Sequence, residues 1–105
     1  MPMRYEIILS REAVEDLRNL DAHDRAAIRD ALEVHLRHEP TKVSKSRIKR
    51  LRGMTQPQYR RRVEEIRVFY DVVGTTIQVL AIVAKSQAEE WLQKAGTPDE
   101  EDSSH

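Results

Sequence analysis

Residues 59–72 read YRRRVEEIRVFYDV and contain two runs in which apolar and charged side chains alternate. In an extended chain, successive side chains point to opposite faces of a sheet. The alternation therefore predicts two strands, over 59–63 and 66–72. Beyond a turn at Gly74, the run 76–84 is almost wholly apolar, so we expect a third strand that is central and buried on both faces. Together the three strands form a meander.

The region before this meander predicts one more strand and two helices. Alternation over 3–9 indicates a half-buried strand, and apolar residues then recur at helical spacing over 11–20 and 22–38. Ser10 and Asp21 stand where side-chain caps of these two helices are expected. The helices precede the meander and cover one face of it, which predicts an α+β fold of two layers with a mainly antiparallel sheet.

The end of the chain predicts a short helix and a tail. Ser86 can cap a helix over 87–95, and Gly96 can stop it. A chain of 105 residues is long enough for one domain only. We therefore expect a single domain over 1–96 and a disordered acidic tail over 97–105.

Composition excludes several classes of protein. The chain has 39% hydrophobic and 34% charged residues and no cysteine, so it has no disulfide framework, thiol nucleophile or cysteine-zinc site. No apolar run approaches the length of a membrane span, and we expect no signal peptide. These features predict a cytoplasmic protein that does not enter a membrane.

Positive and negative residues are equal in number but are not evenly distributed along the chain. Lys+Arg and Asp+Glu both total 18, but no acidic residue occurs between Glu39 and Glu64. The bases of that stretch are Lys42, Lys45, Arg47, Lys49, Arg50, Arg52, Arg60, Arg61 and Arg62. Its first part, 41–57, is expected to be irregular. Such a local positive field predicts a polyanionic partner, either nucleic acid or an acidic protein segment.

Three arginines are expected to share one face of the sheet. If Tyr59 and Val63 point to the core, then Arg60 and Arg62 point to the uncovered face, and Arg67 on the next strand joins them. Three guanidiniums at one place can bind a phosphate and stabilise a pentavalent phosphorane. The simpler alternative is a solvated charged face.

Arg61 falls on the side assigned to the core, where an unpaired charge is very unfavourable. Three explanations stay open: the side chain reaches an edge, it pairs with a carboxylate from the helices, or the strand is bulged.

Other chemistries have little support in the sequence. His35 and His38 lie at a spacing compatible with a shared ion, but the end of a helix also favours histidine, and no third ligand is evident. Neither a phosphate-binding glycine loop nor a catalytic triad has a supporting pattern. We therefore expect no metal and no cofactor.

The span from Tyr5 to about Leu92 resembles the RelE/ParE superfamily of toxins from type II toxin–antitoxin modules. The matching segments are, in order, Tyr5–Ser10 with Ala13 and Leu17, Leu51–Gly53, Tyr59–Val63, Ile66–Val72, and the apolar strand into Lys85. Their order and spacing over most of the chain make the combination specific.

The resemblance to the RelE branch implies a metal-independent endoribonuclease that cuts messenger RNA in the ribosome and so inhibits translation. In that branch a ribose 2′-hydroxyl attacks the adjacent phosphate. Arg60 and Arg62 match the paired basic positions of the site, and Arg67 matches the arginine that holds the scissile phosphate. Lys85 is a displaced substitute for a further arginine.

Several roles within this resemblance stay open. Arginine does not deprotonate in proteins, so the general base is Lys85, Glu64 or Glu65. Trp91 stands beside Leu92, which occupies the place of the family's tyrosine, and it either stacks on a substrate base or packs in the core.

The resemblance also implies partners. They are a cognate acidic antitoxin, the ribosome and its messenger RNA. The bases expected to contact ribosomal RNA are Lys45, Arg47, Lys49, Arg50 and Arg52. Two alternatives remain: a ParE-like inhibitor of DNA gyrase, and a non-catalytic relative that only binds an antitoxin or nucleic acid.

Overall fold

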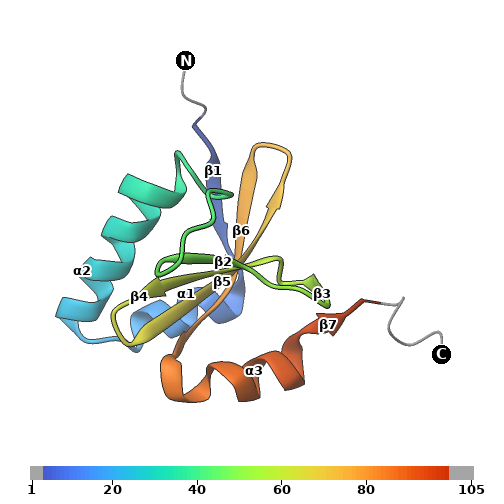
Figure 1. Cartoon of the computed structure of the whole chain (residues 1–105). Coiled ribbons are helices and arrows are strands. Elements are labelled where there is room, and N and C mark those ends of the chain that lie inside the picture. Colours follow the sequence, from blue (N-terminus) through green and yellow to red (C-terminus); the bar gives the residue numbers. More distant parts are fainter. Residues whose placement is uncertain (1–3, 100–105) are drawn as a thin grey trace.

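The computed structural model describes residues 4–99 and consists of helices packed on a mainly antiparallel sheet (Figure 1). The strands are β1 (Glu6–Leu9), β2 (Ile48–Arg50), β3 (Met54–Gln56), β4 (Tyr59–Val63), β5 (Ile66–Val73), β6 (Thr76–Ala84) and β7 (Thr97–Pro98). The α-helices are α1 (Arg11–Arg18), α2 (Ala22–Asp30) and α3 (Ala88–Ala95). A π-helical segment, Ala31–Leu36, continues α2, and a 3-10 turn, Lys85–Gln87, precedes α3. The predicted α+β class is confirmed.

The main sheet has five strands in the order β1-β6-β5-β4-β2. Strand β1 runs parallel to β6, and the other neighbours are antiparallel. The meander β4-β5-β6 is the predicted one. The parallel pairing of β1 was not predicted, because a single short strand shows no direction in its sequence pattern.

The core lies between this sheet and the helical hairpin. Ile28, Leu32 and Leu36 pack against Val68 and Tyr70 of β5, all of them buried. The hairpin begins as predicted, since the Ser10 side chain accepts a hydrogen bond from the Ala13 N–H and the Asp21 carboxylate accepts one from the Asp24 N–H.

Strand β6 is longer than its parallel partner β1. Side chains at the start of α1 and within it bond to backbone groups of the part of β6 that β1 does not pair with. The register shifts at Leu80, which stands between the partners of Phe69 and Tyr70. The Ser10 hydroxyl donates to the Leu80 carbonyl at 2.8 Å, and the Asp16 carboxylate accepts from the Ile82 N–H at 2.9 Å. Helix α1 thus satisfies backbone groups that β1 does not reach.

The sequence predicts that β6 is the most buried strand, but in the structure β5 is more buried. Residues 66–71 of β5 are all buried, while Gln78 and Ala84 of β6 are exposed. The reason is position, because β5 is the middle strand of the five.

The segment 41–57 is more ordered than its sequence indicates. Strand β2 pairs with β4, and β3 forms a small second sheet with β7. Strands of two or three residues are too short to show a period, so the sequence could not reveal them.

The chain remains packed beyond 96, which corrects the expected start of the tail. Thr97 and Pro98 form β7, and the Asp99 carboxylate accepts a hydrogen bond from Thr55 at 2.9 Å. The remainder of the predicted tail, 100–105, lies outside the described residues.

Helix α3 begins differently from the prediction and ends as predicted. Gln87, not Ser86, precedes its first residue, and it makes no side-chain cap. Gly96 ends the helix, with its backbone in an extended conformation. A Cβ at Gly96 would lie 2.3 Å from Met54 Cε and 2.5 Å from the Leu92 carbonyl oxygen, so glycine is needed there for close approach.

Within residues 4–99, no helix is both long and apolar enough to cross a membrane.

Candidate phosphate-binding face

The pairing of strands β2, β4 and β5 brings four cationic residues to one face of the sheet. Arg62 stands directly opposite Arg67, and Arg60 stands opposite Phe69 on β5 and Lys49 on β2. Directly opposed residues have Cβ atoms roughly 5 Å apart and share a face. The structure therefore places Arg60, Arg62 and Arg67 together, as the alternation in the sequence predicts.

Arg67 is the anchored member of this cluster. Its side chain is only 6% exposed, and Nη1 donates to the carbonyls of Glu64 and Ile66, both at 3.0 Å. Burial lowers the pKa of the Arg67 guanidinium, and the positive charges of Arg60 and Arg62 lower it further. The three guanidiniums thus repel one another, and an anion between them would relieve this repulsion.

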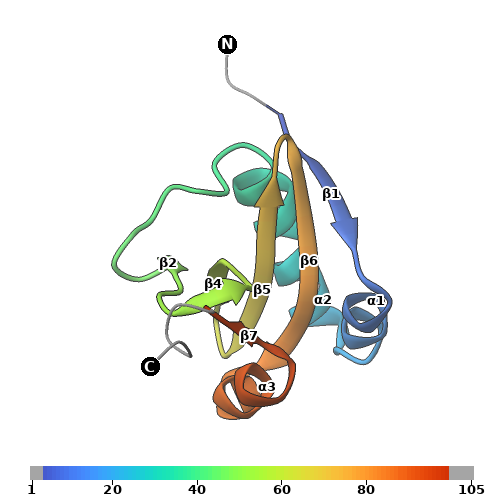
Figure 2. The same ribbon diagram turned by 90° about the vertical axis from the view of Figure 1, so that its right-hand side faces the viewer.

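Helix α3 covers part of the face that was expected to be open. The Trp91 and Phe69 rings stack with centroids 4.8 Å apart and an interplanar angle of 11°. The Trp91 indole N–H also donates to the Glu12 carboxylate at 2.6 Å. Figure 2 shows α3 beside the lower ends of β5 and β6. Trp91 therefore packs on the sheet, the second of the two uses that the sequence left open.

Lys85 lies at the end of β6, next to the turn between β4 and β5. Its backbone N–H donates to the Glu65 carbonyl at 2.8 Å, and the residue is exposed. This contact places Lys85 at the same end of the sheet as Arg67 and Glu65.

Glu64 occupies a special position in that turn. Its φ is 54°, in the left-handed region that L-residues rarely adopt. Its carboxylate lies 3.2 Å from His23 Nε2, and this hydrogen bond raises the pKa of the His23 imidazole. Of the two glutamates proposed as bases, Glu64 is therefore engaged by a histidine, while Glu65 acts on Arg67 through its charge.

The basic segment splits between the two faces of the sheet. Lys49 lies on the face of Arg60, and Lys45 and Arg52 are exposed. Arg50 is exposed but fixed against the surface, because Nη1 donates to the carbonyls of Leu51 and Gln58 and its guanidinium lies 5.3 Å from the centre of the Tyr59 ring.

Arg61 lies on the other face of β4, and Arg47, in the bend before β2, borders both Arg61 and Arg62. Arg61 is 7% exposed, and β4 pairs with β5 residue for residue, so the strand is not bulged. No ion pair of Arg61 forms within the described residues, and its Nε has no hydrogen-bond partner. The side chain lines a hollow of about 160 Å³ together with Arg47 and His35. The bulge and the carboxylate pair are therefore excluded, and the side chain instead extends out of the core into this hollow.

The histidine spacing seen in the sequence does not produce a metal site. In the part of the chain that the structure describes, the group whose ligand atoms come within 4.8 Å of one another is His23, Asp24 and Glu64, without His35 or His38. Its members come from α2 and from the β4–β5 turn, so spacing in the sequence could not reveal it. Exposed groups of this composition are common without an ion.

Solved structures with a similar fold are toxins, alone or in complex with their antitoxins. An archaeal RelE–RelB complex from Pyrococcus horikoshii has a TM-score of 0.67 at 23% identity, covering 81% of this chain and 99% of that one. A free double-arginine mutant of the Escherichia coli toxin RelE has a TM-score of 0.66 at 22% identity, covering 89% and 95%. The RelBE2 complex from Mycobacterium tuberculosis has a TM-score of 0.65 at 24% identity, covering 78% and 99%.

The fold and the sequence together define a type II toxin of the RelE/ParE superfamily. Residues 7–89 match the model of the family described as the ParE toxin of type II toxin–antitoxin systems. The chain therefore belongs to this toxin family. Among curated proteins, none matches the sequence significantly.

Proposed function

We propose that the protein is a ribosome-dependent mRNA endonuclease whose Arg60, Arg62 and Arg67 bind the scissile phosphate. The observation that carries the proposal is the convergence of these three guanidiniums beside the β4–β5 turn, with none of them ion-paired within residues 4–99. A cluster of unpaired guanidiniums is well suited to a phosphate, which can accept bidentate hydrogen bonds from each.

The proposed reaction is an internal displacement in RNA. The ribose 2′-hydroxyl gives its proton to a general base, and the 2′-oxygen attacks the adjacent phosphorus. The bond from phosphorus to the 5′-oxygen breaks, and this oxygen takes up a proton from water, so the products are a 2′,3′-cyclic phosphate and a 5′-hydroxyl end. The guanidiniums stabilise the negative charge that develops on the phosphoryl oxygens, so the reaction needs no metal ion. The products follow from the bonds formed and broken and give the reaction a recognisable end group.

The residues proposed for proton transfer lie at the β4–β5 turn, at the end of the sheet that holds Arg67. Lys85 is the proposed general base, because it lies beside the turn that holds Arg67. Glu65 is the other candidate, because its carboxylate is close enough to act on Arg67. Lys85→Met and Glu65→Gln are compared in the pH profile of cleavage. The general base is the residue whose loss removes the fall in rate on the acidic side of the profile, where the base becomes protonated.

RNA outside the cleavage site is proposed to contact the exposed bases of the segment between α2 and β4. Lys45, Lys49 and Arg52 are the exposed bases proposed for this role. Arg50 and Arg47 are exposed too, but Arg50 donates to protein carbonyls and Arg47 lines the hollow beside Arg61. Loss of each phosphate contact is expected to reduce the slope of log binding constant against log salt concentration by about one. A ribosomal target also implies action in the cytoplasm.

A second candidate function is inhibition of DNA gyrase, as in ParE-like toxins. The family model that matches residues 7–89 carries the name of the ParE toxin, and Lys85–Ser86 stands where the RelE branch has a further arginine. Inhibition of gyrase by binding would require no phosphoryl-transfer site, and so would not depend on Arg62 and Arg67.

The proposed protein partner is an antitoxin. Two of the similar structures are complexes of a RelE toxin with a RelB antitoxin, and the local positive charge of this chain favours an acidic segment. Co-purification with the product of the neighbouring open reading frame tests this part of the proposal.

The test of the main proposal is induced expression in a host that lacks the antitoxin. Arg62→Gln is the chosen variant because Arg62 is exposed, and Arg11→Gln on α1 is the matched control. We expect growth arrest and new 5′-hydroxyl ends within translated messages for the wild type and the control, and neither for Arg62→Gln. Arrest that persists in Arg62→Gln, without new ends, would contradict the nuclease and favour gyrase.

A further inference from the structure

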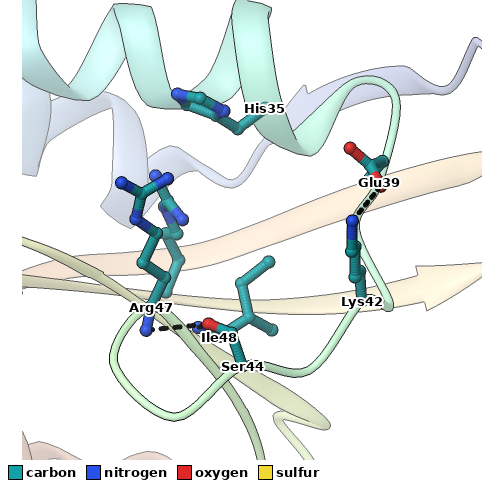
Figure 3. A pocket seen from close by; sticks show the side chains of 7 residues that line it. His35, Glu39, Lys42, Ser44, Arg47 and Ile48 are labelled. Carbon is teal, nitrogen blue, oxygen red and sulfur yellow. Dashed lines mark hydrogen bonds and ion pairs between the residues drawn. The ribbon is translucent and has the colours of Figure 1, made fainter.

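A small hollow lies on the opposite side of β4 from the phosphate-binding face. It is bounded by the π-helical end of α2, by the loop that follows, and by β2 and β4, with Ile48 as its apolar wall. Figure 3 shows the His35 ring above the Arg47 side chain, while Glu39 and Lys42 stand together at one side. We call this cavity the Arg61 hollow.

Two guanidiniums enter the hollow without a carboxylate to pair with. Arg61 is more than nine-tenths buried, and its Nε has no hydrogen-bond partner. Arg47 lines the same cavity. Burial lowers the pKa of the Arg61 guanidinium, and the positive charge of Arg47 lowers it further. The one carboxylate at the hollow, Glu39, is already paired with Lys42 at 3.2 Å. A buried, unpartnered cation beside a second cation is very unfavourable unless an anion joins it.

The walls of the hollow are fixed, so it is a preformed cavity. The Ser44 hydroxyl oxygen accepts hydrogen bonds from the N–H groups of Arg47 at 3.0 Å and Ile48 at 3.3 Å. The Arg47 carbonyl accepts from the Arg62 N–H at 2.7 Å, which ties the loop to β4. On the other side, the Tyr70 hydroxyl donates to the Pro40 carbonyl at 2.6 Å. The backbone that carries Arg47 and borders Arg61 is therefore fixed before any ligand arrives.

We propose that the Arg61 hollow binds the carboxylate of one Asp or Glu side chain from the antitoxin, with Arg61 and Arg47 as its two cationic ligands. The inference rests on the proposed antitoxin and adds the contact by which this chain recognises it. A carboxylate matches the fork of a guanidinium and fits a cavity of about 160 Å³.

A protein carboxylate suits the hollow better than an RNA phosphate. The segments around it carry exposed apolar side chains, since Val34 is 55% and Val43 is 57% exposed, and apolar surface favours a peptide. Glu39 at the hollow opposes a chain of successive phosphates. Arg61 also lies on the opposite face of β4 from Arg60 and Arg62, while Arg47 borders both Arg61 and Arg62.

The first experiment tests the anion site without a partner. Purified protein is titrated with sodium acetate, with sodium phosphate and with sodium chloride at equal ionic strength, and the Arg61 Nε–H signal is followed by NMR. We expect acetate to move this signal saturably and chloride to leave it unchanged. An Arg61 signal that responds to phosphate and not to acetate, or to neither, would overturn the proposal.

The second experiment measures antitoxin affinity for the wild type, for Arg61→Met and for the charge-matched control Arg11→Met. Removing one partner of a buried charge pair is expected to weaken binding roughly 30-fold or more, with the control unchanged. Equal affinity of Arg61→Met and wild type would overturn the inference and leave the antitoxin proposal standing. A wild type that binds no antitoxin would overturn both.

Discussion

Strand β4 carries arginines on both of its faces, and the two faces place them in opposite environments. On one face Arg60 and Arg62 stand beside Arg67, whose guanidinium is held by two turn carbonyls. On the other face Arg61 is buried in a hollow with Arg47 and has no partner of its own. Under our two proposals, adjacent arginines of one strand serve two different anions, an RNA phosphate on one face and a protein carboxylate on the other.

The largest change is expected in the rate of mRNA cleavage, which should depend on one face of β4 and not on the other. The double variant Arg60→Gln/Arg62→Gln should lower the rate of mRNA cleavage by on the order of 100-fold or more, because it removes charge where the phosphoryl oxygens become negative. Arg61→Met should leave this rate unchanged. Cleavage rates of a translated message in a cell extract measure both, and equal losses in the two variants would remove the distinction between the faces.

Arg67→Ala should affect stability as well as activity. It leaves the carbonyls of Glu64 and Ile66 without their buried donor, which is expected to lower the free energy of unfolding by about 1–3 kcal/mol. Urea unfolding of Arg67→Ala beside Arg62→Gln measures the difference. Equal stability of these two variants would mean that Arg67 does not hold the turn.

Arg61→Met should stabilise the folded protein, whereas Arg67→Ala should destabilise it. Replacing a buried, unpaired cation with an apolar side chain of similar length is expected to raise the free energy of unfolding by about 1 kcal/mol or more. Thermal unfolding of the isolated protein measures this gain. A loss of stability would show that Arg61 has a partner in the free protein and would weaken the case for an incoming carboxylate.

The β4–β5 turn, next to the phosphate-binding face, holds Glu64 in a strained backbone conformation, and relieving this strain should change stability by a smaller amount. Glu64 at φ 54° and Gly74 at φ 61° follow the last residues of β4 and β5, so the two hairpins place a glutamate and a glycine in the same role. Glu64→Gly should stabilise the protein by roughly 1 kcal/mol, and Gly74→Ala should destabilise it by a similar amount. A Cβ at Gly74 meets nothing within 4 Å, so this control reports backbone strain alone. Urea unfolding of both variants provides the test.

The smallest effect is a pH dependence at the same turn. The hydrogen bond to Glu64 raises the pKa of His23 above its ordinary 6.5, so the folded state favours the imidazolium. Its contribution to stability is fully present below pH 6.5 and is lost as the pH rises through the raised pKa of the folded state. NMR titration of His23 should give a pKa above 6.5 that falls in Glu64→Gln. A pKa that does not change in this variant would contradict the assignment.

Local pattern was enough to predict most of the fold. The period of two over 59–72 identified β4 and β5, and caps at Ser10 and Asp21 located both helices of the hairpin. The same alternation placed Arg60, Arg62 and Arg67 on one face, since cross-strand register follows once a tight turn joins the strands.

Features that depend on distant segments were beyond the sequence. Strands β2, β3 and β7 have two or three residues and leave no period to read. The side of the sheet that α3 covers is decided by the Trp91–Phe69 stack, which joins residues far apart in the chain. The Arg61 hollow combines the end of α2, a loop and β4, and the sequence showed only that Arg61 has no obvious place in the core.

The central claim is that the face with Arg60, Arg62 and Arg67 cuts RNA on the ribosome. The most direct test incubates the purified toxin with ribosomes programmed with a defined message and, in parallel, with DNA gyrase and relaxed plasmid, using wild type and Arg62→Gln in both. We expect a new 5′-hydroxyl end in the message only with ribosomes and wild-type toxin, and unimpaired supercoiling by gyrase. An intact message together with supercoiling that both proteins inhibit equally would contradict it.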